Sequence, residues 1–435
     1  MTEIRPFQGI RYNQQIVTDL SKIICPPYDV ISEERRRDYY ERSDYNMVRL
    51  EHPLAPVASE AAQSNDDKYS RAAASFKQWL EQGILQIDDR PAFYLHDHYF
   101  TYLGERKRRR GLLARVRLRP WYSGVYPHEE TFSKAKGDRL RLMRACRASF
   151  GPLFTLYQDP QEEVGSVLSK ASEHKAITKL DTRDESHVVW AITDPELIRQ
   201  ISGLMTSRAL YIADGHHRYE TALMYQQERT RLHSELHEEY QTRAFNYVMM
   251  LLVPFSDPGL VVFPVHRVIR GIAPSSLAGL EDRLREFFVL EYVPITGGLA
   301  GILKSKMVDG HLMGILGLKS NTLIVLRQRQ GISMQGIMPE DRSGAYRDLD
   351  ISLLNHLILG RMLGISEDSE KITYVADVDE VCQQLDKEEC QIAFLLNPPQ
   401  PKVIKAIADA RDRMPRKSTY FYPKPPAGLV INSLD

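Results

Sequence analysis

The chain has 435 residues, 43% of them hydrophobic, which is enough to bury a sizeable core in two domains or three. Its 57 basic and 57 acidic side chains cancel, so no global field draws it to nucleic acid or to an anionic membrane surface. The first residues form no apolar signal segment, and the longest apolar run, 247–255, is too short to span a bilayer. We therefore expect a cytoplasmic protein without a membrane or nucleic-acid partner, and leave an oligomer open.

The first part of the chain predicts two helices. Serine followed by two glutamates at 32–34 is typical of a capped helix start, and the run continues to Tyr40. A second helix covers 71–85, where apolar residues recur at helical spacing and Gly83 provides a stop. Four cysteines without C-x-x-C spacing indicate buried thiols in a reducing compartment.

A long β-hairpin follows. Residues 93–104 and 110–118 have strand character and flank a charged tip, ERKRRR. Arg115, Arg117 and Arg119 extend the basic stripe. A solvated hairpin or a phosphate-facing strand is the preferred interpretation, and a nucleic-acid contact is the alternative.

Helix and strand then alternate. Short apolar strands at 188–192 and 209–213 each precede helical sequence, which argues for mixed α/β architecture. Beyond Pro264 we expect a helix at 277–288, then strands and further helices; the strands are expected at 288–293, 311–318 and 322–327. The predicted organisation is an α/β domain over 1–270, with the hairpin inserted in it, and an α+β domain over 271–435.

Residues 210–222, LYIADGHHRYETA, form the strongest candidate site. A strand, a glycine turn and a helix start make an arrangement that binds phosphate, because unpaired amides and the helix dipole both favour an anion. Gly215 permits the tight turn and a close ligand approach. Arg218 can pair with phosphate oxygens, and His216 and His217 add donors or metal ligands.

In the alternative interpretation of this segment, Asp214 caps the helix and the histidines lie on the surface. That interpretation explains the carboxylate but neither imidazole. We expect Asp214 to have a catalytic role and, with His216, to hold a divalent metal. Arg218 is expected in solvent, where it contributes little to stability.

A second cluster spans 125–145 and begins with His128, Glu129 and Glu130. A carboxylate beside an imidazole is a usable general base or metal-ligand pair. The following helix carries basic residues that could neutralise polyphosphate: Lys134, Lys136, Arg139 and Arg141. An amphipathic helix with a charged start is the alternative. The functional interpretation requires that 128–130 and 214–218 line one pocket.

Several common motifs are missing from the sequence. It contains no Walker A segment, no G-x-G-x-x-G, no G-x-S-x-G and no H-E-x-x-H, which disfavours the common nucleotide folds and hydrolases. The C-terminal stretch 413–431 is either an ordered tail that brings Lys417, Ser418 and Thr419 to the site or a plain terminal strand.

Seven segments carry a resemblance to a known family: PPYDVIS, PHEET, GPLFTLY, ADGHHRYETAL, NYVMMLLVPFSDPGLVVFPVHR, AFLLNPP and RMPRKSTYFYPK. In this order, over about 5–431, they resemble the domain of unknown function 1015 family of prokaryotic proteins.

Within that family, ADGHHRY is similar to the G-x-H-R or G-x-R-R box of ParB-like partition proteins, sulfiredoxins and ParB-related free serine kinases. Gly215, His217 and Arg218 match the box, and His216 fills its variable place. The resemblance implies a ParB-like nucleotide-binding domain in which a helix N-terminus holds the phosphates of ATP, ADP or CTP. His216 stands where sulfiredoxin has its catalytic cysteine, and no helix-turn-helix follows, so sulfinic acid reduction and DNA clamping are disfavoured.

These observations favour a nucleotide-dependent phosphotransferase that acts on a small hydroxylated metabolite such as serine. Gly215, Arg218 and the other basic residues would hold phosphates, with Mg²⁺ or Mn²⁺ bound near Asp214 and a histidine. Glu129 or Glu130, beside His128, would take the hydroxyl proton. A nucleotide sensor or partner-binding protein without turnover is the alternative. A metal-dependent hydrolase built on His128, Glu129, His216 and His217 is third, because their spacing fits no familiar metal motif.

Overall fold

The computed structural model describes residues 1–54, 67–131, 133–232, 238–296, 299–306, 312–332, 334 and 336–435. They form two compact units. Unit 1 comprises Met1–Pro127, Thr131–Leu260 and Pro423–Asp435, and unit 2 comprises His128–Glu130 and Val261–Tyr422. These units differ from the expected domains 1–270 and 271–435 in two ways. Residues 423–435 belong to unit 1, and residues 128–130 of the second predicted cluster belong to unit 2.

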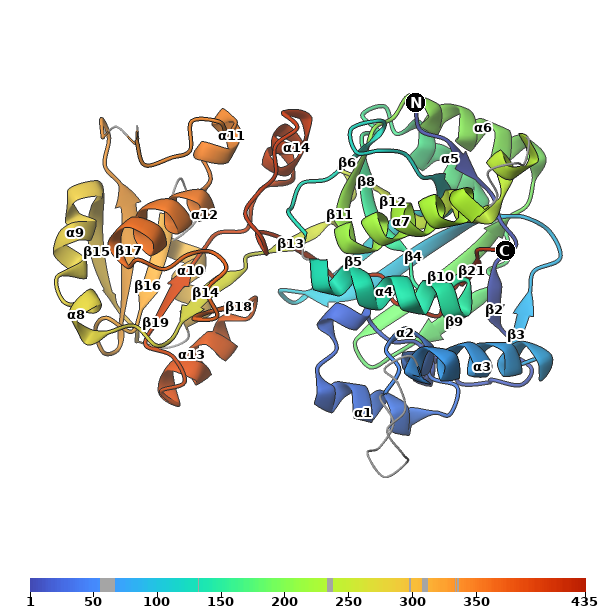
Figure 1. Ribbon diagram of the computed structural model, residues 1–435, viewed down its shortest axis with the longest axis horizontal. Helices are drawn as coiled ribbons and strands as arrows, with labels where there is room; N and C mark the ends of the chain where they lie inside the picture. The colour runs from blue at the N-terminus through green and yellow to red at the C-terminus, as the bar shows by residue number, and fades with distance from the viewer. Residues whose placement is uncertain are drawn as a thin grey trace. The chain divides into compact units, whose positions relative to one another are not determined.

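Unit 1 is built on a mixed sheet, nine-stranded over the described residues, in the order β6-β11-β8-β12-β5-β4-β10-β9, with β1 also paired to β5 (Figure 1). β11 runs parallel to β6 and antiparallel to β8, and β12 runs parallel to β8. The strands are β1 Ile4–Arg5, β4 Phe93–Tyr102, β5 Glu105–Arg117, β6 Val125–Tyr126, β8 Leu153–Tyr157, β9 Thr178–Asp181, β10 Glu185–Ile192, β11 Leu210–Asp214 and β12 Tyr247–Pro254. Two short pairs accompany the sheet: β2 Ile10–Tyr12 with β3 Leu85–Ile87, and β7 Ala148–Ser149 with β21 Asn432–Ser433.

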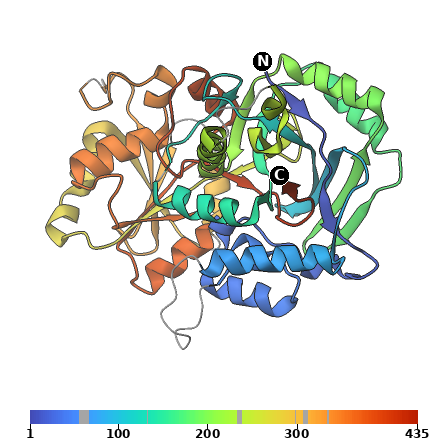
Figure 2. The same cartoon turned by 45° about the vertical axis from the view of Figure 1, so that its right-hand side comes forward.

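Helices of unit 1 bury their apolar faces on the sheet or on each other. α5, α6 and α7 contribute Val164, Ile201 and Tyr219 to the core, all fully buried. α4 packs between α3 and α7, and Figure 2 shows α4 in teal next to α3 in blue. The α-helices are α1 Glu33–Arg42, α2 Val48–Glu51, α3 Asp67–Glu81, α4 Ser133–Cys146, α5 Glu163–Ala171, α6 Pro195–Thr206 and α7 His216–Leu232. The short 3-10 helices are η1 Leu20–Lys22, η2 Tyr28–Val30, η3 Glu238–Thr242 and η4 Ala244–Asn246.

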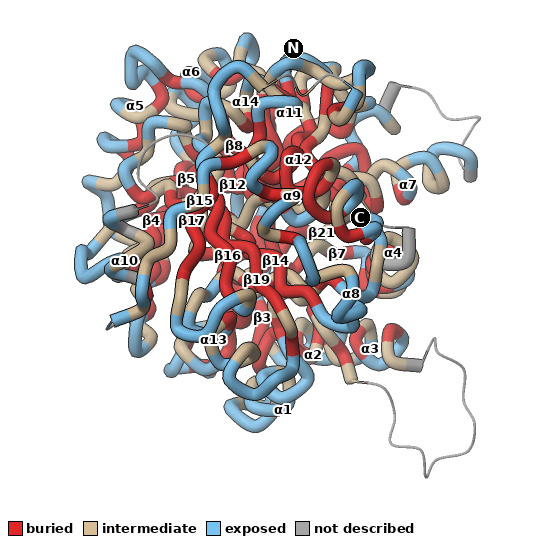
Figure 3. Tube along the Cα trace, turned by 90° about the vertical axis from the view of Figure 1, so that its left-hand side faces the viewer, coloured by how far each residue is buried: buried red, intermediate tan, exposed pale blue. Residues whose placement is uncertain are grey.

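Unit 2 has its own sheet, in the order β15-β17-β16-β19-β14-β18, and its own core. Figure 3 draws β14, β16 and β19 in red, because apolar residues such as Ile315 and Phe394 are fully buried there. The strands are β13 Val261–Phe263, β14 His266–Ile269, β15 Phe288–Pro294, β16 Leu312–Leu316, β17 Thr322–Gln328, β18 Ile372–Val375, β19 Ile392–Leu395 and β20 Tyr420–Tyr422. The helices are α8 Pro274–Leu277, α9 Leu280–Phe287, α10 Leu299–Lys306, α11 Gly344–Arg347, α12 Asp350–Leu353, the π-helix η5 Leu354–Met362, α13 Val378–Asp386 and α14 Pro401–Asp409. The predicted mixed α/β class is confirmed.

Several local predictions hold for a visible reason. Ser32 caps α1 by accepting from the amide of Arg35, and Gly83 follows α3 with φ +70°. Cys25, Cys146 and Cys390 are buried free thiols, as expected, whereas the free thiol Cys382 is only half-buried. No helix among the described residues is both long and apolar enough to cross a bilayer.

The predicted tip of the hairpin is wrong. β4 turns at Leu103 and Gly104, both with positive φ, and ERKRRR forms the start of β5 instead of a loop. A two-residue turn of this kind matches the twist of the strands, which keeps the basic run inside the ladder. Arg115 donates to Asn432 Oδ1 at 2.6 Å and Arg117 donates to the Gln241 carbonyl at 2.9 Å. These arginines serve the fold, which weakens the case for a nucleic-acid contact.

Candidate functional site: a buried lysine at the β11–α7 turn

The segment 210–222 forms the strand, turn and helix that its sequence predicts. β11 ends at Asp214, and α7 begins at His216. Gly215 has φ +101°, a backbone conformation that L side chains rarely adopt, and a Cβ there would lie 3.0 Å from Leu153. The pairing of β11 with β8 shifts register between Ile212 and Asp214. Bulges of this kind re-aim a side chain, here the Asp214 carboxylate at the end of the strand.

Asp214 accepts from two cations. Its Oδ1 lies 2.6 Å from Lys424 Nζ, and its Oδ2 accepts from Arg218 Nη2 at 2.8 Å. Lys424 Nζ also contacts Asp29 Oδ2 at 2.5 Å. The Lys424 side chain is 8% exposed. A buried ammonium thus bridges two carboxylates directly beside the glycine turn.

The electrostatics of this group explain why it can stay charged. Burial alone would lower the pKa of Lys424, but the carboxylates of Asp214 and Asp29 raise it above its usual value. The same balance holds for Arg218, whose pKa is raised by Asp214, Asp29 and Glu51 against the effect of burial. Lys424 and Arg218 are therefore both cationic at neutral pH.

Arg218 is buried, which contradicts the expectation that it lies in solvent. Its side chain is 11% exposed, and Nη1 donates to the Pro152 carbonyl at 2.9 Å. A small cavity of about 40 Å³ adjoins it, lined also by Glu51, Arg139 and Thr221. That volume suits ordered water and is too small for a nucleotide.

The two histidines of the box differ in exposure. His216 is 6% exposed, while His217 is half-buried and its carbonyl accepts from the Thr221 hydroxyl at 2.8 Å. The pairing of His216 with Asp214 as a metal site stays a prediction, made harder by the cations on both oxygens of that carboxylate.

Arg139 is engaged inside unit 1. It donates to the Glu51 carbonyl at 2.6 Å, pairs with Asp138 and lies 4.0 Å from the centre of the Tyr28 ring. It is 5% exposed, so its predicted contact with a cofactor would require these partners to be replaced. The side chain of Lys134 lies outside the described residues.

His128, Glu129 and Glu130 are held within unit 2. His128 is fully buried, with Nε2 2.9 Å from Thr419 Oγ1. Glu129 Oε1 accepts from the amides of Ser418 and Thr419 at 3.1 and 2.9 Å and from the Thr419 hydroxyl at 2.8 Å.

Glu130 pairs with Arg342 at 3.1 Å and lies 3.7 Å from Arg416. These contacts give all three side chains of 128–130 a structural role within unit 2. Their shared pocket with 214–218 stays a prediction.

Asp29 and Lys424 were missed by sequence reasoning. Both stand in segments that the resemblance had singled out, PPYDVIS and RMPRKSTYFYPK. In both segments a charged residue stands beside prolines and aromatic residues. A turn does not require a charge at such a position, so this pattern could have indicated a site residue.

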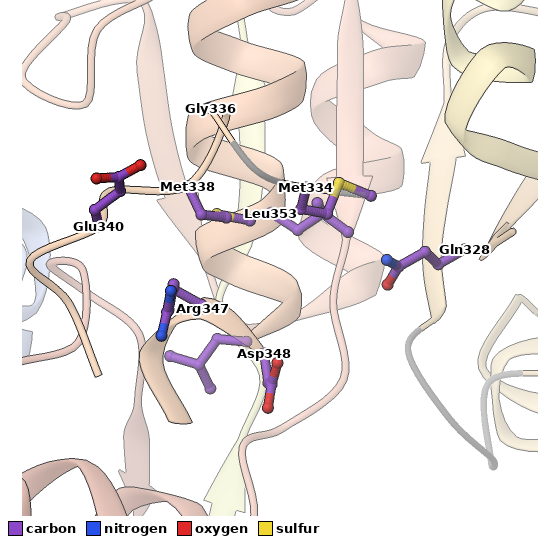
Figure 4. Close-up of a pocket in the computed structure, with 9 residues that line it drawn as sticks. Gln328, Met334, Gly336, Met338, Glu340, Arg347, Asp348 and Leu353 are labelled. Carbon is purple, nitrogen blue, oxygen red and sulfur yellow. The ribbon is translucent and has the colours of Figure 1, made fainter. Parts of the chain in front are cut away.

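Unit 2 has two larger cavities, and among the predicted site residues only Ser418, from the C-terminal tail, is found in the described lining of either. One has about 560 Å³; in Figure 4 its apolar side chains, Met334, Met338 and Leu353, lie near the centre, with Glu340 and Arg347 beside them. The other has about 850 Å³ and lies along residues 396–406. Asp348 and Leu349 line both.

Comparison with known proteins gives a family and distant structural likenesses. Residues 4–352 match the family model described as protein of unknown function (DUF1015). No curated protein matches the chain significantly.

Among solved structures, a mutant free serine kinase in complex with AMP is similar at 10% identity and a TM-score of 0.35, over 72% of this chain and 87% of that one. A second free serine kinase structure, with ADP, gives 10% identity and a TM-score of 0.34, over 72% and 87%. A conserved hypothetical protein from Pyrococcus furiosus gives 11% identity and 0.32, over 73% and 93%. Likenesses this distant carry no argument about function, which has to come from the site itself.

Proposed function

Starting from the fact that this chain belongs to the DUF1015 family, we propose that it is a nucleotide-dependent phosphotransferase acting on a small hydroxylated metabolite, such as free serine. The observation that carries the proposal is Lys424, a buried ammonium held by Asp29 and Asp214 at the glycine turn before α7. A buried ion pair of this kind is weak evidence for stability, because desolvation offsets its attraction. Buried charge in a strand–glycine–helix turn is better explained by chemistry.

Phosphoryl transfer depends on positioning and on cations around the phosphate oxygens. The dipole of α7 favours an anion at its N-terminal end. Gly215 lets phosphate approach the backbone, and Arg218 and Lys424 supply positive charge from two sides of Asp214. We place the nucleotide phosphates at this turn, where they would share Arg218 and Lys424 with the carboxylates.

A divalent cation fits this donor set through oxygen ligands. Mg²⁺ and Mn²⁺ prefer carboxylates to imidazoles. Asp29 is half-buried, with a side chain 29% exposed, and shares Lys424 with Asp214. In the proposal these two carboxylates, and not Asp214 with His216, would hold the cation that neutralises the transferred group, once Lys424 and Arg218 have turned from Asp214 toward the bound phosphates.

Asp29 is also our choice for the group that takes the proton of the substrate hydroxyl. It is the more exposed of the two carboxylates, so a substrate can reach it. Glu129 and Glu130 are weaker choices, because their oxygens already accept from unit 2 amides, a hydroxyl and arginines.

A nucleotide sensor without turnover is the second candidate. One observation favours it: Arg218 and Lys424 are already neutralised by carboxylates, so bound phosphate would have to redistribute these ion pairs. Redistribution of buried pairs is a two-state change of the kind that switches use.

The experiment combines binding and transfer. Thermal shifts are recorded with ATP, ADP and CTP, with and without Mg²⁺ or Mn²⁺; a ligand at 100 times its dissociation constant should add about 2.7 kcal/mol to stability. Transfer of labelled γ-phosphate is then screened over serine and other hydroxylated metabolites.

Lys424→Met should reduce both responses, and Lys179→Met, at an exposed lysine of unit 1, should change neither. Binding without transfer would favour the sensor, and the lack of any nucleotide response would reject both candidates.

A further inference from the structure

Three histidines and a glutamate gather inside unit 1, away from the β11–α7 turn. β4 carries His96 and His98, and β10 carries Glu185 and His187. His98 lies directly opposite His187 in the antiparallel register, and alternation along each strand places all four residues on one face of the sheet. The ring centres of His98 and His187 are 4.1 Å apart. The three imidazoles are at most 1% exposed.

One ring nitrogen of this cluster lacks a hydrogen bond. His187 Nδ1 pairs with His96 Nε2 at 3.1 Å, and His98 Nε2 lies 2.8 Å from Glu185 Oε2. His187 Nε2 is buried without a hydrogen-bond partner; Glu185 Oε2 is 3.7 Å away. Buried polar atoms are nearly always paired, so this nitrogen requires an explanation.

We propose that His98 Nε2, His187 Nε2 and a Glu185 oxygen bind a divalent transition-metal ion of the Zn²⁺ type. The three ligand atoms lie within 4.8 Å of one another, close enough for one ion to reach all of them after small side-chain rotations. Two imidazoles and one carboxylate select a transition metal over Mg²⁺ or Ca²⁺, which prefer oxygen ligands.

The surroundings supply the support that such a ligand needs. In the tautomer where His187 Nδ1 donates to His96 Nε2, the lone pair of His187 Nε2 is available to a metal. Metal-bound histidines usually donate their second nitrogen in this way, which fixes the ring. Glu185 has a side chain 29% exposed, so an ion can reach the site from its end of β10.

Arg109 determines which ring nitrogen of His98 carries the proton before a metal binds. Its Nη2 lies 3.2 Å from His98 Nδ1, and a guanidinium can only donate, so Nδ1 accepts and Nε2 carries the proton that Glu185 receives. For Nε2 to bind a metal as part of a neutral imidazole, its proton must move to Nδ1, because loss of both ring protons would leave an imidazolate. Arg109 Nη2 then turns away from Nδ1, which becomes a donor. Metal binding leaves the number of protons on His98 unchanged.

The test uses the untagged full chain after treatment with a chelator. Calorimetric titration with Zn²⁺ should give one site, with affinity reduced by about 10-fold to 100-fold or more in Glu185→Gln and in His187→Asn. His174→Asn, at an exposed histidine of the same unit, should bind Zn²⁺ like the wild type. Melting curves without metal identify a variant that fails to fold, and Glu185→Gln then decides, because Glu185 lies partly in solvent.

A further readout uses Co²⁺, which should give visible d–d absorption in the wild type that Glu185→Gln loses. Failure to bind Zn²⁺, equal binding of Zn²⁺ by both variants and the wild type, or unchanged Co²⁺ absorption in Glu185→Gln would each overturn the assignment. None of these results depends on phosphotransfer.

Discussion

Arg218 combines a structural role with its proposed functional one. Its guanidinium spans Asp214 and the Pro152 carbonyl while it adjoins the cavity beside Glu51. When a side chain that donates to several buried acceptors is removed, some of those acceptors are left without a hydrogen bond. Its substitution should therefore affect folding as well as binding.

For Arg218→Ala we expect nucleotide affinity to fall by about 10-fold to 150-fold, since a charge-assisted contact is worth roughly 1.5 to 3 kcal/mol. The free energy of unfolding should fall by about 3 kcal/mol or more, because Asp214 loses a cationic partner. Arg218→Lys should restore part of the nucleotide affinity and part of the stability, because lysine keeps the charge but lacks the planar guanidinium group.

Calorimetry and urea unfolding measure the two effects. Arg199→Ala, which removes an exposed pair with Glu196, is the matched control and should change neither. Unchanged nucleotide affinity in folded Arg218→Ala would contradict the phosphate role.

The choice of base gives a second prediction for single residues. Asp29→Asn should reduce turnover by about 100-fold or more while nucleotide binding persists, because general-base contributions are typically of that size. Glu129→Gln should leave turnover close to the wild-type value, because its carboxylate serves the turn at 418–419. Steady-state rates of the two variants decide, and the opposite ranking would reinstate Glu129.

Among the elements, the strand–glycine–helix turn was predictable because its signals are local. Apolar residues before Asp214, a glycine, and helix-forming residues after it are read directly from neighbouring positions. The hairpin shows the limit of the same reasoning. Charge suggested a tip at ERKRRR, whereas the backbone turns at Leu103 and Gly104, where positive φ fixes the strand register.

The contacts of Lys424 could not be predicted from pattern. Asp29 is 395 residues away along the chain, and no periodicity relates them. Arg218 was placed in solvent because a first-turn helix position usually is, and only the packing of residues 150–153 and Glu51 around it makes it buried. Local sequence thus predicted the frame of the site and left its charge pairs open.

The glycine turn supports a prediction at the scale of the element. Gly215→Ala places a side chain at φ +101° and within 3.1 Å of Arg218, so we expect a loss of about 1 to 3 kcal/mol of stability. Gly203→Ala, in the exposed face of α6 with open space around it, should instead gain about 0.5 to 1 kcal/mol. Urea unfolding of the two variants compares them, and equal effects would show that the turn conformation is not required.

For the molecule as a whole, two neutral histidines, one half-buried and one buried, predict sensitivity to mild acid. Burial lowers the pKa of His52 in unit 1 and of His266 in unit 2 to about 4. Because the folded pKa lies below the unfolded value of about 6.5, this contribution is complete above pH 6.5 and is lost as pH falls toward 4.

The buried His266 should cost up to about 1.4 kcal/mol of unfolding free energy per pH unit in that window, and the half-buried His52 should cost less, because solvent screens its charge. Urea midpoints measured between pH 7 and 4.5 test this expectation. His266→Asn should keep an acceptor for the Leu396 amide and should reduce the pH dependence of the unfolding free energy of unit 2. A midpoint independent of pH over this range would contradict the prediction.

The return of residues 423–435 to unit 1 also sets the order in which the protein can be made. On the ribosome, all of 261–422 is synthesised before β21, which pairs with β7, and before Ile431, which bonds to Ile10. Domains usually fold as units during synthesis, so the nascent chain can fold unit 2 while unit 1 still lacks β21. Lys424 follows unit 2 in the chain, so the charged centre beside Gly215 is completed only after residues 261–422 have been translated.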